Sequence, residues 1–227
     1  MSFIVISLLF MGLGMLVQAR LKSKFKEYSK VPTSSGMSGK EIAERMLRDN
    51  GIYDVSVVSV QGFLSDHYDP TKKTVNLSPE VYAASTVSAA AVAAHECGHA
   101  VQHATAYSML QFRSALVPVV RISTSLAQWV IIIGLGLFTV GGGNPTVLLI
   151  GIILFGASTL FSVITLPVEF DASSRALKWL NTSHLMHGQE HEKAKDALKW
   201  AALTYVVAAL ASIAMLVHYI MIYNDRR

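Results

Sequence analysis

Four long apolar stretches, almost free of charged residues, dominate the hydrophobic pattern of the chain. A transmembrane α-helix needs about 20 mostly apolar residues, and each stretch approaches or exceeds that length. The pattern therefore predicts membrane spans at residues 1–19, about 122–140, 146–166 and 201–223. The two middle spans share the apolar range 117–166, interrupted by Arg121 and the short turn Gly141–Pro145, and are expected to form a transmembrane hairpin.

Charge predicts the orientation of these spans. Five basic residues directly follow the first span: Arg20, Lys22, Lys24, Lys26 and Lys30. The positive-inside rule then places the polar ranges 20–116 and 167–200 in the cytoplasm and both termini outside. The two arginines at the C-terminal end weakly oppose this orientation. A cleaved signal peptide is disfavoured, because no basic residue precedes the first apolar stretch.

Composition supports a membrane protein and argues against a nucleic-acid-binding one. Hydrophobic residues make up 52% of the chain and charged residues only 15%, which is few for a soluble protein. The net charge of +4 suits basic margins beside anionic lipid but is too small to indicate nucleic acid as a partner. Cys97 is the only cysteine, so no intrachain disulfide can form, and we interpret it as a structural filler.

The first polar range carries signals for short helices and strands. Ser38 and Glu41 have capping-box spacing, which predicts a helix that ends at Asn50–Gly51. Val55–Val60 and Thr74–Leu77 have strand character and predict a small hairpin-like sheet. We expect Thr74–Leu77 either to bind substrate as an edge strand or only to complete the hairpin. The fold class is therefore a mainly α multi-pass membrane protein with a small α+β domain.

The motif His95-Glu96-Cys97-Gly98-His99 follows an alanine-rich run and reads H-E-x-x-H. We expect a helix capped by Ser85 or Thr86 that continues to about Ser108. Its two histidines are four residues apart, so both leave one helix face and can bind a single Zn²⁺. Glu96 can accept a proton from water as the general base.

A catalytic zinc site has three protein ligands and one open position, so a third ligand must come from elsewhere. Glu169 is the favoured candidate, and Pro167 is expected to end the third span just before it. His67 is the main competitor. His103 shares the stripe of the two histidines, but one more helical turn places it too far along, so lining a cleft or supporting a ligand suits it better. A loop at Asn181–Glu192 holds three further histidines, more typical of a solvated loop than of a second metal site: His184, His187 and His191.

The H-E-x-x-H motif, Asp66–Pro70 and Leu166–Ser173 together resemble the YugP-type membrane zinc metallopeptidases of bacteria, over nearly the whole chain. The resemblance implies a gluzincin-type protease domain related to the HtpX-like membrane proteases. It also implies one zinc per chain, held by His95, His99 and Glu169, with Glu96 catalytic. It leaves open whether Ser173 or Asp171 supports His95, and whether His67, Tyr68 or His103 stabilises the oxyanion.

The predicted function is a zinc endopeptidase of the bacterial inner membrane, with its active site facing the cytoplasm and extended or unfolded membrane proteins as substrates. The domain order is a first span at 1–19, the first part of the protease domain at 20–116, the hairpin at 117–166, a ligand-bearing segment at 167–200 and a last span at 201–223. The alternatives are an intramembrane zinc protease and a proteolytically silent metal-binding scaffold. The intact Glu96 argues against the scaffold, which needs no general base.

Overall fold

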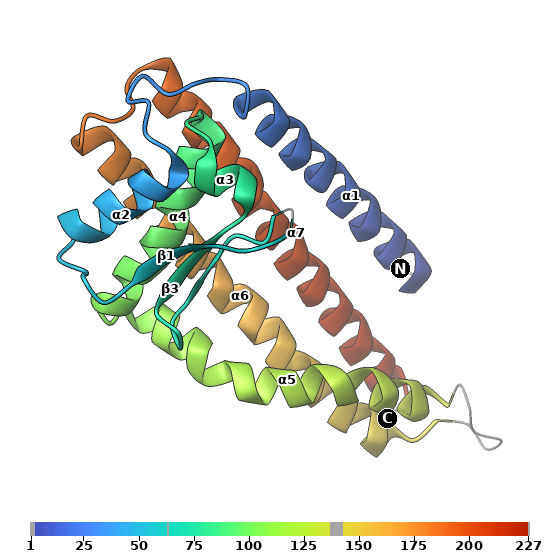
Figure 1. Ribbon diagram of the computed structural model, residues 1–227. Coiled ribbons are helices and arrows are strands. Elements are labelled where there is room, and N and C mark those ends of the chain that lie inside the picture. Colours follow the sequence, from blue (N-terminus) through green and yellow to red (C-terminus); the bar gives the residue numbers. More distant parts are fainter. Residues whose placement is uncertain (1–2, 63, 137–142, 227) are drawn as a thin grey trace. The chain divides into compact units, whose positions relative to one another are not determined.

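The computed structural model describes residues 3–62, 64–136 and 143–226 (Figure 1). The ends of the first two predicted spans and part of the turn between the middle spans lie outside these residues. The described chain is mainly helical. Its elements in order are α1 Phe3–Tyr28, α2 Gly39–Asp49, β1 Ser56–Ser59, β2 His67–Asp69, β3 Thr74–Leu77, α3 Pro79–Ala83, α4 Val87–Ala104, α5 Ser108–Leu135, α6 Pro145–Thr182 and α7 Gln189–Asp225.

Four helices are long and apolar enough to cross a membrane: α1, α5, α6 and α7. They confirm the four predicted spans by length and composition. The chain divides into two compact units. One comprises Met1–Leu16, Gln111–Leu166 and Thr204–Arg227, and the other comprises Val17–Leu110 and Pro167–Leu203. We call the first the apolar unit and the second the polar unit.

Helix α6 corrects a boundary expected from the sequence. Pro167 was expected to end the third span, yet α6 continues through it to Thr182. Proline removes one main-chain donor and crowds the preceding turn, but apolar helices tolerate it where neighbouring groups satisfy the freed carbonyl. Helix α7 is likewise unbroken from Gln189, so the predicted histidine loop shortens to residues 183–188.

Local capping signals agree with the structure. The Ser38 side chain accepts from the Glu41 main-chain N–H while the Glu41 carboxylate accepts from Ser38, which confirms the capping box that starts α2. Thr86 caps α4 in the same way through the Ala89 N–H. Helix α4 ends at Ala104 rather than near Ser108, because Ala106 adopts a left-handed φ of 50° and the chain restarts as α5.

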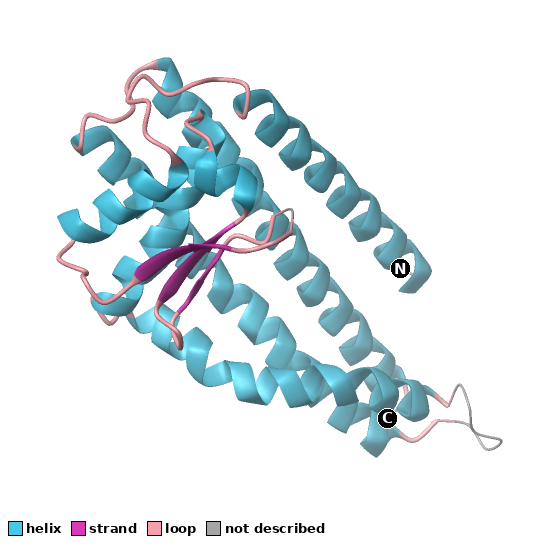
Figure 2. Ribbon diagram, in the orientation of Figure 1, coloured by secondary structure: helices cyan, strands magenta, loops and turns pink. Residues whose placement is uncertain are grey.

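The sheet has the strand order β1-β3-β2, and Figure 2 shows its strands in magenta. Strand β3 pairs in parallel with β1 and antiparallel with β2. The predicted hairpin of the first and last strands is therefore wrong. The intervening segment supplies a third strand that pairs on the free side of β3. Because β3 is central, it cannot be the substrate-binding edge strand. The edges are β1 and β2.

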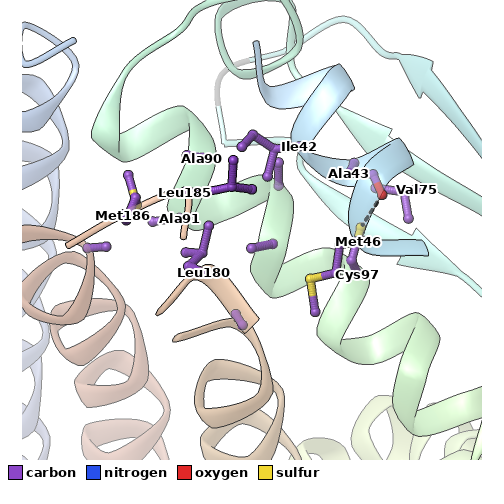
Figure 3. Close-up of a cluster of buried hydrophobic side chains, with 14 of the residues drawn as sticks. Ile42, Ala43, Met46, Val75, Ala90, Ala91, Cys97, Leu180, Leu185 and Met186 are labelled. Atoms are coloured by element: carbon purple, nitrogen blue, oxygen red, sulfur yellow. Dashed lines mark hydrogen bonds between the residues drawn. The ribbon is translucent and has the colours of Figure 1, made fainter. Parts of the chain in front are cut away.

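The polar unit has its own hydrophobic core. Figure 3 shows apolar side chains of α2, β3 and α4 gathered against Leu180, Leu185 and Met186. Cys97 belongs to this core: it is fully buried, and its thiol donates to the Ala43 carbonyl oxygen at 3.5 Å. Burial raises the pKa of the Cys97 thiol well above its usual value, which suits the expected role as a filler.

Within the apolar unit, α5 and α6 approach closely at glycines. A Cβ on Gly134 would lie 2.5 Å from the main-chain nitrogen of Leu148, and one on Gly151 would lie 2.6 Å from the Ile131 side chain. Small residues at such crossings allow membrane helices to gain van der Waals contact. Ile131 and Leu148 are accordingly buried there, together with Ile152 and Tyr219.

Candidate metal centre

Helix α4 places His95 and His99 on one face, as their spacing predicts. Their rings lie edge to face with centroids 4.9 Å apart. Fifteen residues of α4 are buried. Such a buried helix can carry two imidazoles only if other groups satisfy their nitrogens.

Helix α6 brings Glu169 to the two histidines. Its Oε2 lies 3.4 Å from His95 Nε2, and its Oε1 lies 3.7 Å from His99 Nε2. Two ligands bound at about 2.0–2.1 Å to one tetrahedral ion lie roughly 3.4 Å from each other. Over the part of the chain that the structure describes, this is the only group of three His, Cys, Asp or Glu side chains with all ligand atoms within 4.8 Å.

Gly98 makes the close approach of α4 and α6 possible. A Cβ at this position would lie 2.5 Å from the Ala172 carbonyl oxygen and 3.1 Å from its Cα. These are main-chain atoms of α6, so they cannot move away as a flexible side chain would. The variable position of the motif just before His99 therefore requires glycine for packing, a role that the sequence did not indicate.

Neighbouring side chains hold both imidazoles through their Nδ1 atoms. Ser173 Oγ lies 3.1 Å from His95 Nδ1, and Gln102 Oε1 lies 3.0 Å from His99 Nδ1. Since an amide oxygen only accepts, His99 carries its proton on Nδ1 and presents its Nε2 lone pair. Groups that hold metal-ligating histidines in this way orient the ring and fix the tautomer.

Gln102 is the residue that sequence reasoning missed. It is completely buried, and its amide Nε2 donates to the Val168 carbonyl oxygen at 2.7 Å and to Asp171 Oδ2 at 2.8 Å. Asp171 also accepts from Arg175 Nε at 2.6 Å. Of the two residues left open by the sequence, Ser173 contacts His95, whereas Asp171 contacts Gln102 on the side of His99. The sequence signal for this contact was a polar glutamine three residues after His99 on an otherwise apolar helix.

The donor set fits a bound metal. Glu169 is 3% exposed, and its Oε2 has no hydrogen-bond partner among the described residues. Burial alone would raise the pKa of Glu169, but the imidazoles of His95 and His99 beside it outweigh burial and hold the pKa below its usual range. The carboxylate is therefore ionised at neutral pH, as a metal ligand must be.

Glu96 lies beside this group without belonging to it. It is 8% exposed, and its Oε2 accepts from the main-chain N–H of Tyr68 at 3.0 Å. Strand β2 thus positions the carboxylate. Tyr68 also contacts α4 through its side chain: its hydroxyl lies 2.8 Å from His103 Nδ1. Burial, together with Asp54 and Asp69, raises the pKa of Tyr68, so the phenol keeps its proton at neutral pH.

The remaining histidines do not join the group. The His67 side chain is turned to the Ser65 carbonyl oxygen, 2.7 Å from its Nδ1, and the residue is exposed. His184 Nδ1 lies 3.3 Å from His187 Nε2, while His191 Nε2 lies 3.2 Å from the Leu177 carbonyl oxygen. These three histidines, two in the loop and His191 in α7, thus do not converge on one point.

Comparison with known proteins agrees with this geometry. Residues 3–224 match the family model described as "Putative neutral zinc metallopeptidase". The chain is 43% identical over 227 residues to "Putative membrane protease YugP" of Bacillus subtilis (strain 168), covering 100% of this chain and 99% of that relative. No solved structure matches the chain. Zinc is accordingly the metal cofactor. The chain belongs to the family of neutral zinc metallopeptidases.

Proposed function

We propose that this protein is an endopeptidase of the gluzincin type that hydrolyses peptide bonds in extended or unfolded membrane proteins at the cytoplasmic face of the bacterial inner membrane. One observation carries the proposal. Two imidazoles and a buried carboxylate converge on one point, and the carboxylate of Glu96 stands next to them, held by strand β2.

His95, His99 and Glu169 would hold the zinc, and Glu96 would not. When bound, zinc supplies a Lewis acid that lowers the pKa of water and polarises the scissile carbonyl. Ser173 and Gln102 keep the Nε2 atoms of the two histidines directed at the site. One carboxylate and two neutral imidazoles leave a net positive charge there, which favours the developing oxyanion.

Glu96 is proposed as the general base. The main-chain N–H of Tyr68 fixes one carboxylate oxygen, so the other remains directed away from the strand and free to take a proton from the attacking water. The same carboxyl group can then deliver this proton to the leaving amine. Proton transfer by a positioned side chain contributes about 10²–10⁴-fold to a rate.

Strand β2 is the proposed binding edge for the substrate main chain. Tyr68 is paired with Val75 across the antiparallel ladder, yet it gives its N–H to Glu96 instead of β3. The N–H and carbonyl of such a residue both point away from the partner strand. The Tyr68 carbonyl is therefore available to an added strand, which would run beside Glu96. An edge of this kind selects extended polypeptide and not a folded surface.

The Tyr68 hydroxyl is the proposed donor to the oxyanion, with His103 orienting it. The pair lies on the same side of α4 as Glu96, because one residue of β2 contacts both Glu96 and His103. His67 and Asp171 have no place in this step. His67 faces the Ser65 carbonyl, and Asp171 supports Gln102.

The site is proposed to lie at the membrane edge. Glu169 follows the uncharged range 146–166 by less than one helical turn. The basic run from Arg20 to Lys30 belongs to the same polar unit as the zinc ligands. That run favours the cytoplasmic face by the positive-inside rule.

Replacing the base while keeping the ligands tests the proposal. Glu96→Gln should retain one zinc per chain and lose at least about a hundred-fold in peptide hydrolysis, since an amide cannot take the proton. Zinc is measured by elemental mass spectrometry, and hydrolysis is measured with an unfolded protein substrate on the purified full-length enzyme. Glu44→Gln, at a half-exposed carboxylate of α2 that pairs with Lys40, is the matched control. Retained hydrolysis in Glu96→Gln would overturn the assignment.

A further inference from the structure

A hollow in the polar unit lies between α6 and α7, apart from the proposed zinc ligands. It has a volume of about 500 Å³, within the range of roughly 300–1,000 Å³ typical of small-molecule sites. The residues from α6 and those from α7 each form a stripe at helical spacing, so the hollow is a groove between two helix faces. We call it the α6–α7 groove.

The α6–α7 groove has an apolar floor and a cationic rim. Its floor consists of Leu177, Leu198 and Ala202, and the half-exposed Phe170 lies at its margin. Its rim carries Lys178, Lys195 and Lys199. None of the described residues that line it is an aspartate or a glutamate. Among the described residues, Lys178 and Lys199 form no ion pair. Lys195 meets only the exposed Glu192 at 3.9 Å, a contact that contributes little. The groove therefore carries uncompensated positive charge above apolar surface.

The position of the groove relates this chemistry to the bilayer. On α6, Phe170 follows the uncharged range 146–166 by about one helical turn, while Lys178 lies two turns further on. On α7, Ala202 belongs to the apolar range 201–223, Lys199 lies two residues before that range and Lys195 lies one turn further out. On both helices the groove residue nearest the span is apolar, and a lysine lies further out.

We propose that the α6–α7 groove binds one anionic phospholipid, with the phosphate held by Lys195, Lys199 and Lys178 and the upper acyl segment lying on Phe170 and Leu198. Charge complementarity and the matched order of apolar and cationic residues carry this assignment. Basic pockets between membrane helices bind anionic head groups for the same reason. A soluble anion would use the lysines and leave the apolar floor unoccupied.

The groove also reaches the zinc site through one residue. Ser173 lines the groove, and its hydroxyl is the group that contacts His95 Nδ1. The groove and the candidate metal centre therefore share this residue. The binding itself does not depend on hydrolysis, so its test is independent of the proposed protease activity.

The test titrates the purified full-length protein, in a neutral detergent, with phosphatidylglycerol, phosphatidylcholine or inorganic phosphate, and counts bound lipid by native mass spectrometry. We expect phosphatidylglycerol to bind in a single tight step and phosphatidylcholine to bind far more weakly. Lys195→Gln with Lys199→Gln should weaken phosphatidylglycerol binding about 25-fold, or fivefold per lysine, which corresponds to ~1 kcal/mol each.

A matched double variant separates the groove from general basicity. Lys22→Gln with Lys26→Gln removes the same charge from exposed positions of α1 and should leave the binding within twofold. Phe170→Asn should weaken phosphatidylglycerol binding by removing apolar contact without changing charge, because Phe170 is 51% exposed. Equal losses in the two double variants, equal binding of the two lipids, or binding of phosphate as tight as that of phosphatidylglycerol would each overturn the proposal.

Discussion

Gln102 donates its side-chain amide to the main-chain carbonyl oxygen of Val168, with 2.7 Å between the two atoms. Val168 immediately precedes Glu169, and the oxygen of the same amide contacts His99 Nδ1. One buried side chain thus joins a histidine on α4 to the turn of α6 that carries the proposed third ligand. The geometry of the metal site depends on this bridge, not only on the three ligands.

Removing the bridge should loosen the site without removing a ligand. Gln102→Leu keeps the volume of the side chain but leaves His99 Nδ1 and the Val168 carbonyl without their partner. We expect zinc affinity to fall about 10–100-fold, the usual effect of losing a group that orients a ligand. Competition with a chromophoric chelator measures it. The exposed Gln61→Leu is the control, and an unchanged affinity in Gln102→Leu would refute the bridge.

Two variants test whether Glu169 or His67 is the third zinc ligand. Glu169→Ala should abolish stoichiometric zinc binding and hydrolysis, because the two histidines alone leave the ion with too few protein ligands. His67→Ala should keep zinc, since His67 is exposed and faces the Ser65 carbonyl. Elemental analysis of both purified variants decides between them. Zinc retained by the first and lost from the second would identify His67 as the ligand.

Because α4 and α6 approach closely at Gly98, a single methyl group added there should lower both stability and zinc binding. Gly98→Ala would place a Cβ 2.5 Å from the Ala172 carbonyl oxygen, so the helices must separate. Overpacking of this kind costs about 1–3 kcal/mol, and separation also moves Glu169 away from the histidines. We expect a lower melting temperature and loss of zinc.

Gly156→Ala provides the comparison for this variant. Gly156 is also in a helix, but nothing lies within 4 Å of a Cβ built there. Alanine should be neutral or stabilise the helix by up to ~1 kcal/mol. The Gly98→Ala and Gly156→Ala variants should therefore differ both in melting temperature and in zinc content. Similar behaviour of the pair would show that the approach at Gly98 is not tight in solution.

The proposed oxyanion donor can be tested by removing one oxygen atom. Tyr68→Phe deletes the hydroxyl that contacts His103 but keeps the main-chain N–H that holds Glu96. Loss of an oxyanion donor costs about 10²–10³-fold in kcat, so we expect a fall of that size with KM and zinc content unchanged. Tyr53→Phe, at a residue 80% exposed, should leave kcat unaltered.

Local and non-local features differ in how well the sequence predicts them. The capping box of Ser38 and the shared face of His95 and His99 depend on spacing along one helix, so they were predictable. The central position of β3 depends on where the chain between β1 and β3 forms β2 and pairs with β3. The contacts of Gln102 and Gly98 depend on which turn of α6 packs against α4. Neither is encoded in a local pattern.

Pro167 shows the same limit for a single residue. Its local effect is to disfavour the helix, and the sequence therefore suggested a break before Glu169. In the structure, the surrounding apolar helix overrides that preference and α6 remains continuous. Helix propensity is a weak signal when many neighbouring residues favour one conformation.

The proposed orientation predicts which positions react with an external reagent. In a Cys97→Ala background, a cysteine at Ser34 should be protected in intact cells, and a cysteine at Gly142 should react with an impermeant thiol reagent. The basic run that follows the first span is the reason. Permeabilised cells should label both positions. Labelling at Ser34 but not at Gly142 in intact cells would reverse the orientation.

The continuity of α6 has a consequence for the order of events during synthesis. His95 and His99 leave the ribosome before either of the middle spans, whereas Glu169 follows both on the helix that forms the second of them. The nascent chain therefore cannot complete its metal site until that helix has formed and docked on α4. An unfinished chain would carry a histidine pair but no competent peptidase.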